Sequence, residues 1–292
     1  MLNKNIETFI ACDKEYSEAD FVLWGAPFDS TTSFRPGTRF ASSAIRHESF
    51  GIETYSPYLD KDMETDLMAF DAGDLELVFG ESEKVLTQVE IMTAEIAKDG
   101  KIPVMIGGEH SLSSAPIKAL LNKYPDLQII HFDAHTDLRE DYLGNKWSHA
   151  SVIKRCWDML GDGRINSFGI RSGMKEEFEW AKEHINLHKF NFEGLEETVT
   201  ALEDKPVYFT LDLDILDPSA FPGTGTPEAG GVSFEELRQA VLLLKDLNVV
   251  GLDVMELSPH YDQSGASTAV ACKIIREILL TLKNKSSSLN IK

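Results

Sequence analysis

The sequence predicts an α/β fold, with a mainly parallel sheet of about eight strands and helices on both of its faces. Three observations support this prediction. Short apolar or β-branched runs alternate with longer segments of helical periodicity. The apolar fraction of 42% is ample for a large buried core, and no Pro/Ser/Gly-rich linker divides the alternation. We therefore expect a single domain over residues 1–292, with a frayed tail at about 283–292.

Eight short runs are predicted as strands, because each is apolar or β-branched and has the length of a buried strand. The predicted strands are Phe21–Trp24, Leu67–Phe70, Pro103–Ile106, Gln128–Phe132, Ile165–Gly169, Leu187–Phe190, Val207–Leu211 and Val249–Leu252.

Four segments between or after these strands carry the signals of helices. Residues 81–100 have apolar residues at a spacing of three to four and end on a glycine. Residues 111–125 begin with a serine that could cap the helix and stop before a proline. Residues 233–248 open with a serine followed by acidic residues, and 264–282 form a last, mostly apolar helix.

Two segments do not fit this alternation. Residues 25–46 and 217–231 are long, rich in Gly and Pro, and partly apolar. Long loops inside a compact domain usually have a function, although an irregular surface excursion is the alternative. We expect both segments to be irregular and to contribute to a site.

Net charge and cysteine usage exclude several classes of protein. A net charge of −20 argues against nucleic acid or an anionic membrane surface as a partner, since both require concentrated Lys and Arg. No apolar run is long enough to span a bilayer, and the N-terminus lacks the pattern of a signal peptide. Cys12, Cys156 and Cys272 lie far apart without a C-x-x-C motif, which predicts neither disulfides nor a thiolate zinc site. The expected location is the cytoplasm.

Histidine and acidic side chains follow four of the predicted strands. Ligands of open α/β sheets bind beyond the carboxyl ends of the strands, so these side chains are candidates for one site. They are His110; Asp133, His135 and Asp137; Asp212 and Asp214; and Asp253 and Glu256. His131 lies two residues before Asp133, the same spacing as between Asp133 and His135. We interpret His131 as a residue that packs within the strand.

Six of these residues, two histidines and four aspartates, predict a metal centre. Four carboxylates brought together without cations would be strongly disfavoured by repulsion and desolvation. Two divalent cations would balance them, and imidazole with carboxylate but no thiolate favours an ion such as manganese. A pair of metals bridged by water supplies hydroxide near neutral pH, which is typical of a hydrolase.

Three motifs within these segments resemble the ureohydrolase family, which includes arginase and agmatinase. They are "GGEHS", "DAHTD" and "LDLDILDPSAFPGTGTPEAGG", and the similarity extends in order from residues 25–46 to "DVMELSP". The resemblance implies a three-layer α/β/α arginase-like fold with two Mn²⁺ ions per subunit, Co²⁺ or Ni²⁺ being alternatives. It also implies hydrolysis of a guanidinium group to urea and an amine, and a homo-oligomer, either a trimer or a hexamer.

The resemblance also implies how the metals are held. The family pattern assigns one ion to His110, Asp133, Asp137 and Asp212, and the other to Asp133, His135, Asp212 and Asp214. In this assignment Asp133 and Asp212 bridge the two ions. The implied reaction is attack of a metal-bridging hydroxide on the guanidinium carbon.

Four residues receive catalytic or substrate-binding roles from the same resemblance. Asp137 would hydrogen-bond the hydroxide and pass its proton to the leaving amine. Glu256 matches the glutamate that pairs with the guanidinium, for which a bidentate carboxylate is suited. His149, in "WSHAS", matches a histidine credited with proton shuttling or substrate contact, and Thr226 matches a threonine close to the substrate.

The segment "LREDYLGNKWSHAS", residues 138–151, bears on the choice of substrate. It resembles the pattern of agmatinases and departs from that of arginases, which favours agmatine as substrate and urea and putrescine as products. Arg139 leaves a carboxylate-bearing guanidine open, such as arginine, guanidinobutyrate or guanidinopropionate, and free guanidine is a further alternative. A non-catalytic binding protein of the same fold would be expected to lack part of the ligand set, and none of the six positions is altered.

Overall fold

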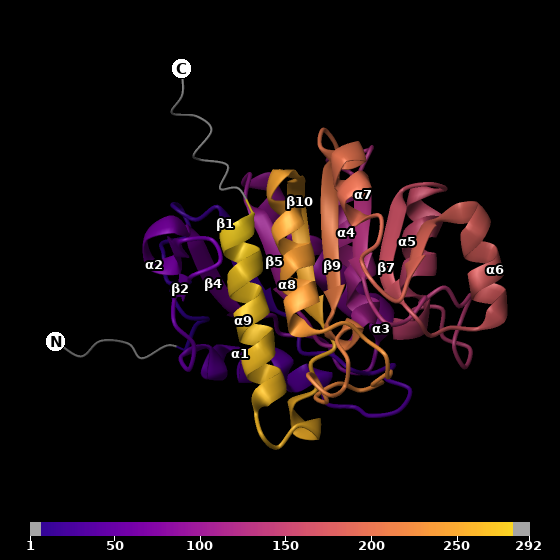
Figure 1. The fold of residues 1–292 in the computed structure, drawn as a ribbon, viewed down its shortest axis with the longest axis horizontal. Coiled ribbons are helices and arrows are strands. Elements are labelled where there is room, and N and C mark those ends of the chain that lie inside the picture. The colour runs from indigo at the N-terminus through magenta and orange to yellow at the C-terminus, as the bar shows by residue number, and fades with distance from the viewer. Residues whose placement is uncertain (1–6, 283–292) are drawn as a thin grey trace.

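A computed structural model describes residues 7–282 and contains an eight-stranded parallel sheet (Figure 1). Every neighbouring pair of strands in this sheet runs parallel. In sheet order the strands are β4 (Ala69–Asp74), β1 (Phe21–Gly25), β5 (Ile102–Ile106), β10 (Asn248–Met255), β9 (Pro206–Asp212), β6 (Gln128–Phe132), β7 (Ile165–Ile170) and β8 (Asn186–Lys189). The predicted fold class is confirmed, with each of the eight strands in its predicted region.

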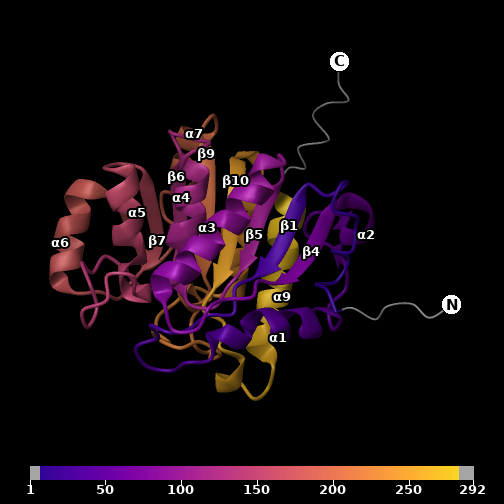
Figure 2. The same ribbon diagram turned by 180° about the vertical axis from the view of Figure 1, so that it is seen from behind.

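Helices cover both faces of the sheet, which gives three layers (Figures 1 and 2). One face carries α1 (Ala41–Ser49), α7 (Leu195–Leu202), α8 (Phe234–Leu243) and α9 (Ala266–Thr281). The opposite face carries α3 (Ser82–Lys98), α4 (Ser114–Leu121), α5 (Val152–Leu160) and α6 (Lys175–His184). The short α2 (Met63–Asp66) and the hairpin of β2 (Tyr55–Ser56) and β3 (Lys61–Asp62) lie outside the sheet.

The four predicted helices are present, and the structure corrects two of the expectations about irregular segments and caps. Residues 25–46 are irregular only in their first part, because a 3₁₀ turn at Thr38–Phe40 leads into α1. The helix predicted for 111–125 begins only at Ser114, after a 3₁₀ turn, and Ser111 does not cap it. Instead the Ser111 hydroxyl donates to the buried carboxylate of Glu109 at 2.6 Å, an acceptor that the sequence does not place.

The strands that end in chemically active residues are neighbours in the sheet. β5, β10, β9 and β6 lie side by side, although they are far apart in the sequence. Because all four are parallel, their carboxyl ends meet at one edge, and the residues that follow them are brought into one volume. The fold therefore assembles the predicted site from four separate segments.

Gly108 lies where the turn after β5 meets the loop after β1 and the segment after β10. The backbone N–H of Glu109 donates to the carbonyl of Phe28 at 2.8 Å, and that of Glu256 donates to the carbonyl of Gly108 at 3.1 Å. A Cβ atom on Gly108 would lie 1.9 Å from the Phe28 carbonyl oxygen. The loop after β1 can thus pack against the turn after β5 only because this position has no side chain.

Two absences expected from the sequence concern cysteines and membrane spans. Cys12, Cys156 and Cys272 are buried and free in the structure. Within residues 7–282, no helix combines the length and apolarity needed to cross a membrane. The predicted tail at 283–292 lies outside the described residues.

Replacing Gly108 by alanine should destabilise the protein by about 3 kcal/mol, since backbone atoms must move to admit the new methyl group. Urea denaturation measures the loss. Gly73→Ala is the control, because Gly73 has φ +79° but no atom within 4 Å of its added Cβ. Its loss should be about 1 kcal/mol from backbone strain alone. Equal losses in the two variants would contradict the packing argument.

Candidate metal centre and active site

The predicted metal ligands gather at the common edge of the four central strands. His110 opens the turn after β5, and Asp133 follows β6 directly. Asp212 is the last residue of β9. Each strand thus delivers its ligand at the point where its backbone leaves the sheet. Six candidate residues, from the segments that follow three of the strands, form one cluster: His110, Asp133, His135, Asp137, Asp212 and Asp214.

Three carboxylates converge on one nitrogen of His110. Its Nδ1 atom lies 3.1 Å from Asp133 Oδ2, 3.2 Å from Asp212 Oδ2 and 3.4 Å from Asp137 Oδ2. This nitrogen is buried, yet it has no hydrogen-bond partner in the described part of the chain. Buried polar atoms are normally paired, so an unpaired nitrogen facing three oxygens has the geometry of a ligand around a cation.

A second group of ligand atoms surrounds His135. Its Nδ1 atom lies 3.0 Å from Asp214 Oδ2 and 3.5 Å from Asp133 Oδ1. Asp133, His135 and Asp214 together form a cluster with the spacing of a metal site. Asp133 thus turns one carboxylate oxygen toward each histidine, and this is the arrangement that a bridging carboxylate requires.

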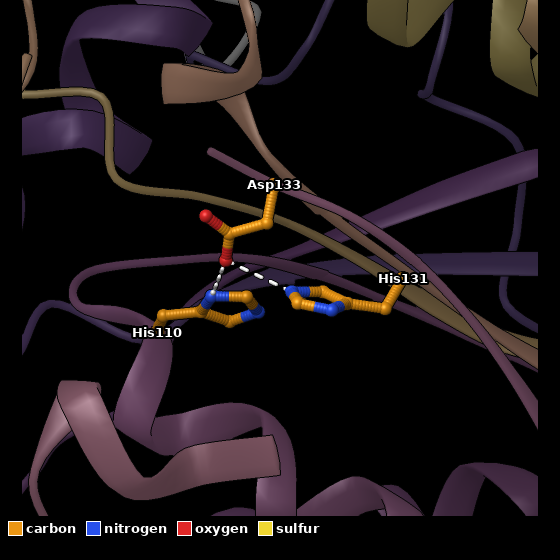
Figure 3. Close-up of side chains that lie close together, drawn as sticks. All are labelled: His110, His131 and Asp133. Carbon is orange, nitrogen blue, oxygen red and sulfur yellow. Dashed lines mark hydrogen bonds and ion pairs between the residues drawn. The ribbon is translucent and has the colours of Figure 1, made fainter. Parts of the chain in front are cut away.

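His131 has a larger role than the strand packing predicted for it. Figure 3 shows His110 and His131 on the same oxygen of Asp133. His131 Nε2 lies 2.8 Å from Asp133 Oδ2, and its Nδ1 lies 3.0 Å from the Ser167 hydroxyl. Both ring nitrogens of His131 therefore have hydrogen-bond partners. His131 thus orients the Asp133 carboxylate from within the sheet. His110, His131 and Asp133 also have metal-site spacing, but only His110 retains a free nitrogen.

The electrostatics of the cluster call for added positive charge. Burial raises the pKa of Asp212 well above its usual range, and the charges of Asp214 and Asp133 add to this effect. Burial acts the same way on Asp133, but contacts with three histidines outweigh it and hold that pKa well below the usual range. No Lys or Arg within residues 7–282 forms an ion pair with the four aspartates.

The donor set is consistent with the metal that the sequence predicted. Carboxylate oxygens and imidazole nitrogens suit a hard or borderline divalent cation, and no thiolate lies among them. Four carboxylates and the unpaired nitrogen of His110 thus fit divalent cations. The residues present meet the chemical requirements of the implied centre.

Glu256 is a buried carboxylate in a strained position next to this cluster. Its backbone φ is +65°, in the left-handed region, and its Oε1 accepts the backbone N–H of His110 at 2.7 Å. Burial raises the pKa of Glu256 to about 8, and the charges of Glu109 and Asp214 contribute. A cation placed beside this carboxylate would offset both the cost of burying its charge and the repulsion from Glu109 and Asp214.

Asp137 has the same kind of backbone strain. Its φ is +51°, a conformation that residues other than glycine rarely adopt. The surrounding structure maintains it on both sides. The Asp137 carbonyl accepts N–H groups from Ile153 and Lys154 at 3.1 and 3.2 Å, and the next N–H, from Leu138, donates to Glu177 at 3.1 Å. Strain of this kind is typical of functional sites.

A cavity of about 280 Å³ lies over the cluster. Asp133 is completely buried beneath it, and the other predicted site residues line it. Thr226 Oγ1 lies 3.5 Å from Asp214 Oδ2, which joins the 217–231 loop to the cluster. The residues that line the cavity include His110, His135, Asp137, His149, Asp212, Asp214, Thr226 and Glu256, with Ser33, Arg139, Tyr142 and Glu177.

His149 is held by the loop after β1, through residues that the sequence did not single out. Ser33 Oγ lies 3.1 Å from His149 Nε2, and Thr31 Oγ1 accepts the His149 backbone N–H at 3.1 Å. Thr31 in turn donates to the fully buried Glu109 through its hydroxyl at 2.6 Å and its N–H at 2.7 Å. The sequence offered one signal for this contact, the glutamate of "GGEH", but only His110 of that motif was predicted as a site residue.

Comparison with known proteins decides the family. A family model described as "Arginase family" matches residues 19–281. The agmatinase of Bacillus subtilis (strain 168) is 50% identical over 278 residues, which cover 94% of this chain and 96% of that protein. This chain belongs to the arginase family. The family recognised from the sequence motifs is thereby confirmed.

Solved structures share the fold of this arginase-family chain. A putative agmatinase from Clostridium difficile has a TM-score of 0.88 and 49% identity, covering 91% of this chain and 98% of that one. The agmatine ureohydrolase of Thermoplasma volcanium has a TM-score of 0.88 and 33% identity, covering 99% and 98%. The three-layer arginase-like fold implied by the resemblance is therefore confirmed.

Glu256→Gln should stabilise the metal-free protein increasingly as the pH rises from 5 to 8. Folding raises the pKa of Glu256 from 4.5 to about 8, so the folded state binds an extra proton and loses stability over that window. The neutral amide removes this loss, which we expect to be about 2 kcal/mol or more at pH 8. Urea denaturation at several pH values measures it, with exposed Glu176→Gln as control. A constant difference between variant and wild type would contradict the prediction.

Thr31→Val should loosen the loop over His149. The variant removes the hydroxyl shared by Glu109 and His149 and should cost about 1–3 kcal/mol, because buried polar groups lose a partner. Hydrogen exchange of residues 29–35 should become faster. The matched control is Thr32→Val, since Thr32 only approaches Glu109 at 3.4 Å. Equal effects of both variants would show that Thr31 does not anchor the loop.

Proposed function

We propose that this protein is a binuclear-manganese ureohydrolase that hydrolyses agmatine to urea and putrescine. One observation carries the proposal: six candidate metal ligands lie beneath a cavity in which a buried glutamate lacks a cationic partner among the described residues. Family membership supports the reaction, and the names of the similar proteins, agmatinase and agmatine ureohydrolase, support the substrate.

Two divalent cations would be held by the residues named from the sequence. His110, Asp137 and Asp212 would bind one ion with Asp133, while His135 and Asp214 would bind the other with Asp133 and Asp212. The distances around the two histidine nitrogens support this division. When bound, the metals supply hydroxide near neutral pH and balance the charge of the four carboxylates.

Glu256 would bind the planar guanidinium group of the substrate. One of its oxygens is anchored by the His110 backbone, which fixes the direction of the carboxylate. Its raised pKa reflects a negative charge buried without compensation, and a guanidinium supplies that compensation with two parallel N–H donors. Thr226, beside Asp214, is the second proposed contact at this end of the cavity.

Asp137 and His149 would handle the protons of the reaction. The Asp137 carboxylate would accept the proton released by the attacking water and return it to the leaving amine. His149, held by Ser33 and Thr31 at the cavity wall, would contact the substrate and exchange its proton with solvent. Water adds its oxygen to the guanidinium carbon, the C–N bond to the alkyl chain breaks, and urea and the amine leave.

Two charged residues of the cavity wall bear on the choice among guanidines. The Arg139 guanidinium is stacked 4.8 Å from the centre of the Tyr142 ring, and the buried carboxylate of Glu177 also lines the cavity. An acid in the cavity wall favours the amine of agmatine, whereas Arg139 keeps guanidino acids as the alternative. A trimer or hexamer and a cytoplasmic location stay predictions from the sequence.

Offering the protein a panel of guanidines in the presence of Mn²⁺ tests the proposal. Agmatine should release urea and putrescine faster than arginine, guanidinobutyrate, guanidinopropionate or guanidine. Asp133→Ala should reduce urea release at least a hundredfold, because it removes a ligand proposed to be shared by both ions. Greater activity on another guanidine would overturn the substrate assignment, and unchanged activity of the Asp133 variant would overturn the metal mechanism.

A further inference from the structure

A line of hydrogen-bonded side chains runs from His110 into the middle of the sheet, away from the cavity. His110 Nε2 lies 2.8 Å from the hydroxyl of Thr210, which donates to Asp253 Oδ1 at 2.6 Å. The hydroxyl of Tyr208 donates to the other oxygen of Asp253, also at 2.6 Å. Thr210 and Asp253 are register partners on β9 and β10, and both are completely buried.

The donors and acceptors in this line have one consistent direction. Asp253 accepts two hydroxyl protons, so the single proton of Thr210 is committed to that carboxylate. Thr210 can then only accept from its other neighbour, His110 Nε2. A neutral imidazole that donates through Nε2 carries no proton on Nδ1.

We infer that Asp253 and Thr210 are positioning residues that keep the Nδ1 lone pair of His110 directed at the metal. Figure 3 shows the two sides of the ring, with one nitrogen facing Asp133 and the other turned away from it. The nitrogen facing Asp133 is Nδ1, which lies among three carboxylates and has no hydrogen-bond partner within residues 7–282. This inference rests on the proposed metal binding.

The position of the line in the fold gives it a second consequence. Asp253 lies in the sheet on a rigid central strand, whereas His110 belongs to the turn after β5. The hydrogen bond through Thr210 connects the His110 ring to two strands of the sheet, β9 and β10. Metal-bound histidines commonly donate their second nitrogen to a carboxylate, and here a threonine hydroxyl transmits that connection.

A packing role alone would make a different prediction. If these groups served only to satisfy buried polar atoms, loss of the Tyr208 hydroxyl and loss of the Thr210 hydroxyl should have similar effects, since both donate to Asp253 at 2.6 Å. Only Thr210 also contacts His110. Tyr208→Phe is therefore a matched control for Thr210→Val.

Calorimetric titration of the metal-free protein with Mn²⁺ tests the inference. Thr210→Val should lower the affinity for one of the two Mn²⁺ ions tenfold to a hundredfold, because the His110 ring loses its orienting partner. Thr210→Ser, which restores a hydroxyl, and Tyr208→Phe should both stay within threefold of wild type. An unchanged affinity of Thr210→Val, or an equal loss in Tyr208→Phe, would overturn the inference. Failure of the wild-type protein to bind two ions would instead overturn the proposed function.

Nitrogen NMR of zinc-loaded wild-type protein provides a test that does not depend on the folding of a variant. With selectively labelled histidine, His110 should show a slowly exchanging proton on Nε2 and none on Nδ1. Zn²⁺ is used because Mn²⁺ is paramagnetic. A proton on Nδ1, or coordination through Nε2, would overturn the inference even if Thr210→Val did not fold.

Discussion

The concentration of carboxylates at one edge of a parallel sheet is the constraint on which the rest of this structure depends. β5, β10, β9 and β6 are neighbours that point the same way, so whatever follows them must share one volume. The chain places four aspartates there and no Lys or Arg pairs with them in the described residues. Such a site is physically sensible only as a receptor for cations.

Several local features that look unfavourable follow from this constraint. Asp137 and Glu256 both adopt left-handed backbone conformations, and both line the cavity over the cluster. Each is held by hydrogen bonds to a neighbouring segment: Asp137 to α5, and Glu256 to the turn after β5. The stability of the helices and strands thus maintains strain that is concentrated at the site.

The residues around the metal ligands divide into two supporting groups on opposite sides. Behind the cluster, in the sheet, His131 orients Asp133, and Thr210 with Asp253 orients His110. Above it, the loop after β1 reaches from Glu109 to His149. The first group has rigid strands as its base, which suits ligands that must not move. The second is built on a loop, which suits contacts with a substrate that enters and leaves.

The sequence by itself determined the eight strands, the fold class, the family and the cluster of metal-ligand candidates, because each depends on local periodicity or on a contiguous motif. It did not determine the partners of those candidates. Glu109 near Thr31 and Asp253 behind Thr210 are contacts between segments separated by 78 and 43 residues, and they leave no local pattern. α1 was hidden by glycine and proline in the preceding loop. Only the tertiary structure decided these long-range contacts, because they depend on which strands lie side by side in the sheet.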